Sequence, residues 1–149
     1  MTLAAHLQDQ QARLERLLAL LADERVLLNA GEVDGQALAQ LAEQKQQELT
    51  TLAELEQRRR AALETLGYGN HTAADIQAAR DQNCLPEWQR LRARAGQAAR
   101  QNRLNGELIN LRMAGNQRLL NELHALAGKD LYGPDGQAQG KAARLSSSA

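Results

Sequence analysis

Leucines recur at seven-residue intervals in the first part of the chain and predict a helix over about residues 3–29. The repeat consists of Leu7, Leu14, Leu21 and Leu28, and Leu3, Leu17 and Leu18 lie on the same face. Such a repeat is typical of a helix that packs along a seam against other helices. Thr2 can cap the start of this helix with its hydroxyl. Residues 31–35 contain two glycines and break the pattern, and Asp34 can cap the helix that follows.

A second helix is predicted over about residues 35–66. Its apolar stripe comprises Leu38, Leu41, Leu52, Leu55 and Leu66, and Leu49 and Leu63 widen it. Lys45 and Arg59 interrupt this stripe at core-type positions. Their long side chains either extend to the edge of the seam or pair with an acid on a neighbouring helix, for which Glu24 is a candidate. We expect Lys45 and Arg59 to help fix the register of the helices.

A short helix over about residues 73–82 and a long one over about residues 86–127 follow. Thr72 and Asp75 resemble a capping box at the start of the short helix, with Asp in place of the usual Glu. Pro86 stands at a helix start, where a missing N–H has no cost. A helix of about 42 residues would be roughly 63 Å long, so it needs partners along its length.

The long helix changes along its seam from small and polar residues to leucines. Asn102 and Asn105 lie at seam positions in its first half, where asparagine commonly fixes register. Its last part and the residues beyond it are rich in leucine, with Leu119, Leu120, Leu123, Leu126, Leu131 and Tyr132. These leucines spread over about 100° of the helix or more. Either all of them are internal core, or some stay exposed and form the edge of a groove for a partner's amphipathic helix.

The composition favours an all-α fold. The 149 residues include no Phe, one Trp, two Tyr and only four Ile and Val, whereas strands favour β-branched and aromatic side chains. Leu, Ala, Gln, Glu and Arg favour helix. We predict an elongated antiparallel three-helix bundle or coiled coil over residues 1–132, with the short helix as a linker. Residues 133–149 bury too little apolar surface to fold, and we expect them to form a mobile C-terminal tail.

The net charge is zero, but the charges are unevenly distributed. Residues 1–67 contain eleven acidic and seven basic side chains, whereas residues 87–118 contain two acidic side chains and seven arginines. This asymmetry favours electrostatic matching between helices. The alternative is a site for nucleic acid or acidic lipid, and a nucleic-acid site would use Arg90, Arg92, Arg94, Arg100 and Arg103. Such domains are usually basic overall and carry interleaved aromatic residues, so we expect no nucleic-acid partner.

The sequence contains no arrangement of residues that predicts catalysis or metal binding. The three histidines are scattered without metal-ligand spacing, Cys84 has no candidate base near it, and no glycine-rich phosphate loop follows a strand. We therefore predict no catalytic site, no metal and no cofactor. The single cysteine and the lack of a signal peptide or of a long apolar stretch predict a cytoplasmic protein without membrane insertion.

Over nearly its whole length, the chain resembles the FlgN-type flagellar export chaperones. The likeness rests on the leucine heptads with Glu24, and on Leu38-x-x-Leu41 to Lys45 with Arg59 beyond it. Further along, it rests on Asn102-x-x-Asn105-Gly106 with Leu108-Ile109. Its most specific part is the run Leu131-Tyr132-Gly133-Pro134-Asp135-Gly136, which follows the long helix.

This resemblance implies a bacterial cytoplasmic chaperone that hydrolyses no nucleotide. Such chaperones hold hook-associated (hook–filament junction) proteins, prevent their premature assembly, and deliver them to the flagellar type III export gate and ATPase complex. The resemblance places client binding in the C-terminal part, here at Leu119, Leu120, Leu123, Leu126 and Leu131. It also makes Tyr132 a candidate contact to the export apparatus. A self-associating coiled-coil scaffold without a client is the alternative function, and a homodimer is compatible with both.

Overall fold

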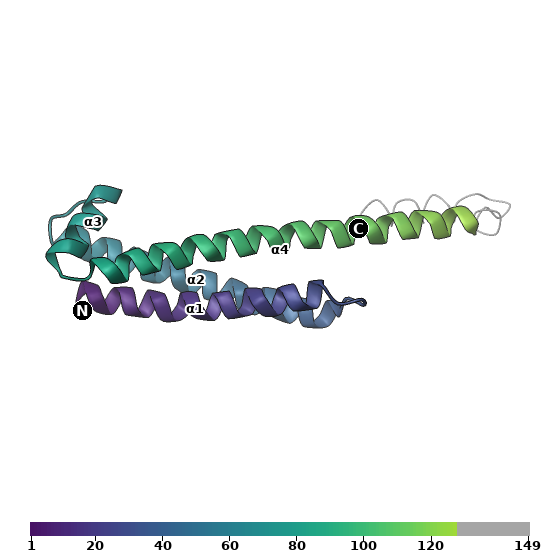
Figure 1. The fold of residues 1–149 in the computed structure, drawn as a ribbon, viewed down its shortest axis with the longest axis horizontal. Helices are drawn as coiled ribbons and strands as arrows, with labels where there is room; N and C mark the ends of the chain where they lie inside the picture. The colour runs from purple at the N-terminus through teal and green to yellow at the C-terminus, as the bar shows by residue number, and fades with distance from the viewer. Residues whose placement is uncertain (128–149) are drawn as a thin grey trace. The chain divides into compact units, whose positions relative to one another are not determined.

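The computed structural model describes residues 1–127, which form four α-helices and no strand, so the predicted all-α fold is confirmed. The helices are α1 (Leu3–Leu28), α2 (Gly35–Thr65), α3 (Thr72–Asp81) and α4 (Leu85–Leu126) (Figure 1). Two compact units divide the chain, Met1–Asn105 and Gly106–Ala149, and α4 contributes to both. The predicted mobile tail, residues 133–149, lies outside the described residues, and so do Leu131 and Tyr132.

Within the first unit, α1 and α2 lie side by side, and the N-terminal part of α4 runs along them (Figure 1). Residues 29–34 connect α1 to α2 in a short turn, so these two helices are antiparallel. The short helix α3 lies at the end of the unit where α2 ends and α4 begins (Figure 1). It therefore serves as the connection that returns the chain to the other helices.

The caps predicted for the first two helices are confirmed. Thr2 Oγ1 accepts a hydrogen bond from the N–H of Ala5 at 3.1 Å. Asp34 Oδ1 accepts one from the N–H of Ala37 at 3.0 Å. Each oxygen satisfies a backbone donor that has no partner inside its helix. These two side chains therefore fix where α1 and α2 begin.

The capping box predicted for α3 is wrong. The N-cap is His71, not Thr72, and its Nδ1 accepts a hydrogen bond from the N–H of Ala74 at 3.1 Å. Asp75, which was expected to complete the box, instead accepts a hydrogen bond from Arg59 Nη1 of α2 at 2.9 Å. A buried guanidinium needs a carboxylate, and a charge-assisted hydrogen bond is about twice as strong as a neutral one. Asp75 therefore pairs with Arg59 of α2 instead of capping the start of its own helix.

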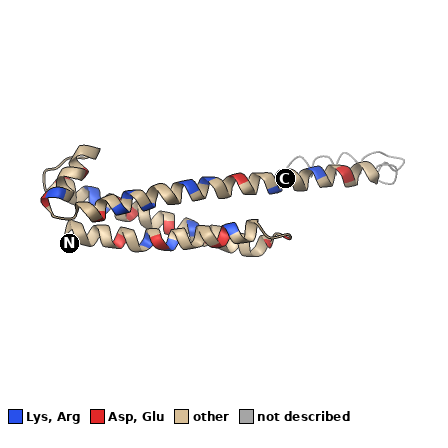
Figure 2. Ribbon diagram, in the orientation of Figure 1, with Lys and Arg blue, Asp and Glu red and all other residues tan. Residues whose placement is uncertain are grey.

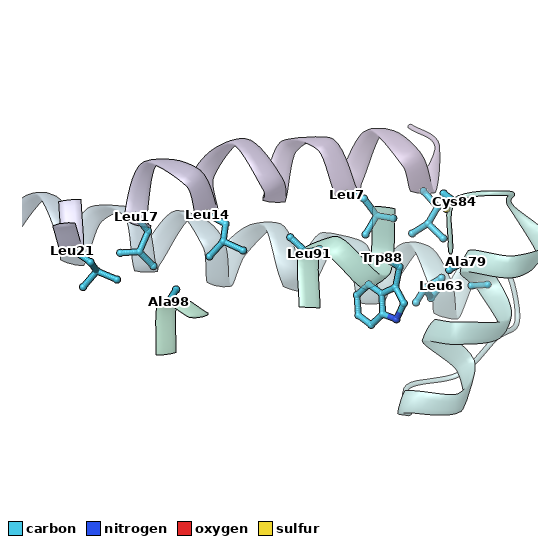
Figure 3. Close-up of a cluster of buried hydrophobic side chains, with 12 residues drawn as sticks. Leu7, Leu14, Leu17, Leu21, Leu63, Ala79, Cys84, Trp88, Leu91 and Ala98 are labelled. Atoms are coloured by element: carbon cyan, nitrogen blue, oxygen red, sulfur yellow. The ribbon is translucent and has the colours of Figure 1, made fainter. Parts of the chain in front are cut away.

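The core of the first unit follows the leucine repeat of α1. Leu7, Leu14, Leu21 and Leu28 are all buried, which confirms the seven-residue seam. The core cluster also contains Ala78 of α3. Figure 3 shows further members from α2, α3, α4 and the residue before α4, namely Leu63, Ala79, Cys84, Trp88, Leu91 and Ala98. Removal of this apolar surface from water is the main favourable term in the folding of the unit.

The apolar stripe of α2 is less buried than its heptad pattern suggests. Leu63 is buried, but Leu49 is exposed. The other members of the stripe are half-buried or exposed, namely Leu38, Leu41, Leu52, Leu55 and Leu66. Part of the contact with α1 is polar instead, because the buried Glu48 accepts from Arg13 Nη1 at 3.3 Å and from Arg16 Nε at 2.8 Å. Apart from Leu63, the α2 leucines therefore lie at the border of the core.

His6 of α1 is buried, and its surroundings predict a pH effect on stability. Burial, together with the charges of the N-terminal amine, Arg58 and Arg59, lowers the pKa of its imidazole below 6.5, against the opposing charge of Asp9. The unfolded chain therefore takes up this proton at a higher pH than the folded chain. Consequently, the stability linked to neutral His6 is complete above pH 6.5 and is lost as the pH falls towards the lowered pKa.

We expect His6→Gln to reduce the loss of unfolding free energy between about pH 7 and about pH 5.5, because that variant has no imidazole to protonate. Urea denaturation of both proteins at several pH values measures this difference. Parallel pH profiles for the variant and the parent would contradict the expectation.

Candidate functional site

The leucines that the sequence suggested for client binding are exposed on the α4 part of the second unit. Leu119, Leu120, Leu123 and Leu126 are between 39% and 85% exposed. Large apolar side chains usually lose water contact on folding, so a group of exposed leucines indicates a surface for interaction. The sequence left open whether these leucines are internal core or partly exposed. For these four residues the internal-core alternative is therefore wrong. Leu131 belongs to the same expectation but lies outside the described residues.

Two further large apolar side chains of this stretch of α4 are exposed, although their place off the seam gave no reason to select them from the sequence. Leu111 and Met113 are exposed on α4. From Leu111 to Leu126 the helix axis extends by about 22 Å. The sequence signal that could have identified them is that both are large apolar residues of the long helix that lie off its predicted heptad seam. Leu111 and Met113 lie about 200° apart around the helix, whereas the four leucines from Leu119 to Leu126 lie within about 120°. We call Leu119, Leu120, Leu123 and Leu126 the α4 apolar surface.

A buried polar cluster joins α1, α2 and α4 inside the first unit. Asn105 is fully buried, and its Nδ2 donates to Glu24 Oε1 at 2.9 Å and to the carbonyl oxygen of Leu21 at 2.9 Å. Lys45 Nζ donates to both Glu24 carboxylate oxygens at 3.2 and 3.3 Å, and to Asn102 Oδ1 at 3.0 Å. Lys45 thus pairs with the acid that the sequence suggested. Since three helices must meet at one level to form these bonds, the cluster supports the predicted register role of Lys45, Asn102 and Asn105.

A second polar cluster surrounds Arg59, which is only 1% exposed and is the inward member of the arginine run 58–60. Its Nη1 donates to Asp75 at 2.9 Å, and its Nη2 and Nε donate to Glu56 at 2.6 and 3.0 Å. The guanidinium carbon lies 4.6 Å from the centroid of the Trp88 ring. Glu24 is therefore not the partner of Arg59. Burial raises the pKa of Glu56, but the hydrogen bonds from Arg59 and Gln10, together with the charges of Arg59 and Arg60, outweigh burial and lower that pKa below 4.5.

The described residues include no group of three or more His, Cys, Asp or Glu side chains that could hold a metal ion. Cys84 is buried, and burial together with the charge of Glu87 raises the pKa of its thiol, which makes it a poor nucleophile at neutral pH. Among the helices of residues 1–127, none combines the length and the apolar character needed to cross a membrane.

The arginines in the first half of α4 differ in whether they pair with a carboxylate of another helix. Arg94 donates to both carboxylate oxygens of Glu15 on α1, at 2.5 and 2.7 Å, as electrostatic matching between helices predicts. The other arginines of the first half of α4 are exposed, namely Arg90, Arg92, Arg100 and Arg103. Figure 2 shows these basic positions as a series of blue segments along the helix. Glu87 is the one acidic side chain between Leu85 and Asn105, so this part of α4 presents a basic surface.

Comparison with known proteins places these features in a family. The family model described as FlgN protein matches residues 1–140. The flagella synthesis protein FlgN of Yersinia enterocolitica (serotype O:8 / biotype 1B) is 32% identical over 142 residues, which cover 93% of this chain and 90% of the relative. The flagella synthesis protein FlgN of Escherichia coli (strain K12) is 30% identical over 138 residues, covering 92% of this chain and 91% of the relative. No solved structure matches the chain. On the family match and these relatives, the chain belongs to the FlgN family.

Proposed function

We propose that this chain is a cytoplasmic flagellar export chaperone that binds the amphipathic termini of hook-associated proteins and prevents their premature assembly. Membership of the FlgN family supports a role in flagella synthesis, since relatives that match most of the chain are named for that process. The observation that carries the binding role is the exposure of Leu119, Leu120, Leu123 and Leu126 on one stretch of α4. We assign the protein no catalytic step, metal or cofactor.

The α4 apolar surface suits a client segment that folds as it binds. A leucine side chain that passes from water to a buried contact contributes about 1.5–3 kcal/mol, so a few leucines suffice for a specific complex. An amphipathic client helix would cover its own apolar face against these leucines, and that face would no longer be free for assembly. Ordering of the client segment reduces the net affinity, which suits a complex that must dissociate before export.

Replacement of Leu119 and Leu123 by alanine tests this binding role. We expect Leu119→Ala/Leu123→Ala to weaken the binding of a peptide from the terminus of a hook-associated protein at least about tenfold, since each truncation removes buried methyl groups from the complex. Isothermal titration calorimetry measures the affinity. The thermal unfolding midpoint should change little, because both side chains are exposed in the free protein.

A matched control uses exposed apolar residues of the first unit. Val26→Ala/Leu104→Ala removes similar side chains, and both positions are exposed. This variant should bind the peptide as the parent does. An equal loss of affinity in both double variants, or unfolding of the Leu119→Ala/Leu123→Ala protein, would rule out the proposed client surface.

Delivery to the flagellar type III export gate and ATPase complex completes the proposed role, with Tyr132 as the contact residue. The alternative is a scaffold that associates with itself through the same exposed leucines. Sedimentation of the free protein distinguishes the two. A stable oligomer that Leu119→Ala/Leu123→Ala dissociates, and that does not bind the client peptide, would favour the scaffold.

A further inference from the structure

An apolar groove of about 350 Å³ lies between α2 and the first half of α4, and every residue that lines it belongs to the first unit. The floor consists of Leu14, Leu17 and Leu21 of α1. The remaining lining residues form the two walls, namely Leu49 and Leu52 on α2, and Ala95, Ala98, Ala99 and Asn102 on α4. These floor leucines are themselves buried, so the apolar surface that the groove offers to a partner lies mainly on its two walls.

The walls of this groove carry apolar side chains that remain open to water. Leu49 is 40% exposed, and Ala95 and Ala99 are exposed as well. Small residues on a helix allow another helix to approach closely, and packed helix axes are typically 8–10 Å apart. A groove with leucines on one wall and alanines on the other therefore suits the apolar face of one additional helix.

Two arginines bracket the alanine wall. Arg92, Ala95, Ala99 and Arg103 follow one another at spacings of three, four and four residues, so they form one ridge on the surface of α4. The two arginines are about 16 Å apart along the helix axis. Both are exposed, and neither forms an ion pair or side-chain hydrogen bond within residues 1–127.

No carboxylate of the neighbouring helices balances these two charges. On α2, Glu56 already binds Arg59 and Arg60. On the opposite side of α4, Glu15 of α1 neutralises Arg94. The groove beside Arg94 is more polar, because one glutamate, two arginines and three amide side chains line it, whereas Asn102 is the one polar residue that lines the groove between α2 and α4. The space between α2 and α4 thus combines apolar walls with an exposed arginine, Arg92 or Arg103, at each end that forms no ion pair within residues 1–127.

We propose that this groove docks an amphipathic α-helix of a partner protein. The apolar face of that helix would carry leucine-type side chains over about two turns. Two carboxylates of the same helix, three turns apart, would pair with Arg92 and Arg103. The apolar side chains would fill the space over Leu49, Ala95 and Ala99. The ion pairs at the rim would add little to affinity but would fix the position of the helix and raise its association rate. This site uses residues of the first unit alone, so it does not depend on the proposed client surface.

A designed peptide tests the proposal on the full chain. The probe is a fluorescently labelled 21-residue helical peptide with leucines at i, i+3, i+4 and i+7 and two glutamates eleven residues apart that flank them. In the control peptide, lysines replace both glutamates. Fluorescence anisotropy at low ionic strength should show binding of the glutamate peptide, and binding of the lysine peptide at least tenfold weaker.

Variants then locate the bound peptide. Ala95→Gln/Ala99→Gln places longer side chains in the groove, and Arg92→Glu/Arg103→Glu reverses the rim charge. Each should weaken binding at least tenfold. Arg90→Glu/Arg100→Glu is the matched control, since it makes the same change in net charge off the ridge and should have less than a threefold effect. Equal effects of the two charge reversals would show nonspecific attraction and overturn the proposal.

Two further measurements separate this site from other surfaces. Leu119→Ala/Leu123→Ala should bind the designed peptide as the parent does. Loss of binding in that variant, with the groove variants unaffected, would place the peptide on the α4 apolar surface and overturn the groove while leaving the proposed client role intact. A dimer of the free protein that Ala95→Gln/Ala99→Gln dissociates would make a second copy the occupant, which contradicts docking of a different partner.

Discussion

Arg59→Leu is expected to lower the free energy of unfolding by about 3–5 kcal/mol, because it removes one partner of a buried ion pair and leaves the other uncompensated. Asp75 is buried and would lose the guanidinium that now lies 2.9 Å from its Oδ1. The same substitution removes the cation above the Trp88 ring. Urea denaturation followed by tryptophan fluorescence is a direct measurement, since Trp88 is the single tryptophan of the chain.

Arg58→Leu provides the control for this prediction. Arg58 is the exposed neighbour of Arg59 on the same helix, and surface substitutions usually change stability by about 0.5 kcal/mol or less. The difference between the two variants therefore isolates the buried interactions from helix propensity and net charge. A loss below about 1 kcal/mol for Arg59→Leu would mean that Asp75 and Glu56 find other partners or water.

Leu21→Ala is expected to destabilise the protein by about 2–5 kcal/mol, because the truncation loses apolar burial and leaves a cavity in a packed core. Leu21 is fully buried and belongs to the core cluster of the first unit. Its carbonyl oxygen accepts the hydrogen bond from Asn105, and that backbone interaction remains possible in the variant. The expected loss is thus one of side-chain packing, and chemical denaturation monitored by circular dichroism at 222 nm measures it.

The same substitution at an exposed leucine should have little effect. Leu111 is exposed on α4, and Leu111→Ala should change the unfolding free energy by about 0.5 kcal/mol or less. Circular dichroism in the absence of denaturant checks that both variants remain helical. Similar losses at Leu21 and Leu111 would contradict the division between core leucines and exposed leucines.

That division separates stability from binding in this chain. The leucines of the α1 repeat are buried among α2, α3 and α4 of the first unit, whereas those of the α4 apolar surface are exposed. A residue that is already exposed can be changed without loss of core packing, so binding can be tested there with the fold intact. The proposals for the client surface and for the α2–α4 groove both rest on this property.

The sequence predicted the helical elements well because helix formation depends on local patterns. The seven-residue leucine repeat located α1, the caps Thr2 and Asp34 located two helix starts, and Pro86 marked the start of α4. The scarcity of β-branched and aromatic residues excluded a sheet. Each of these signals depends on residues that are close together in the chain.

The candidate site was predicted in part. The cluster Leu119 to Leu126 was selected because its leucines cover more than one face of a helix, and the structure leaves all four of them exposed. Leu111 and Met113 were missed, since a heptad analysis gives little weight to apolar residues off the seam. The roles of Leu131 and Tyr132 in client and export contacts stay predictions.

Local sequence patterns thus establish where the helices begin and end and which of their faces are apolar. Three features follow from the folded structure alone: Arg59 pairs with Asp75 of α3, His71 rather than Thr72 caps that helix, and α2 and α4 leave an apolar groove between them. The physical reason is that periodicity and capping depend on neighbours within about one helical turn. Ion pairs and grooves depend on which side chains from distant segments of the chain lie next to one another in the fold. The spacing of residues along a single helix does not determine these contacts.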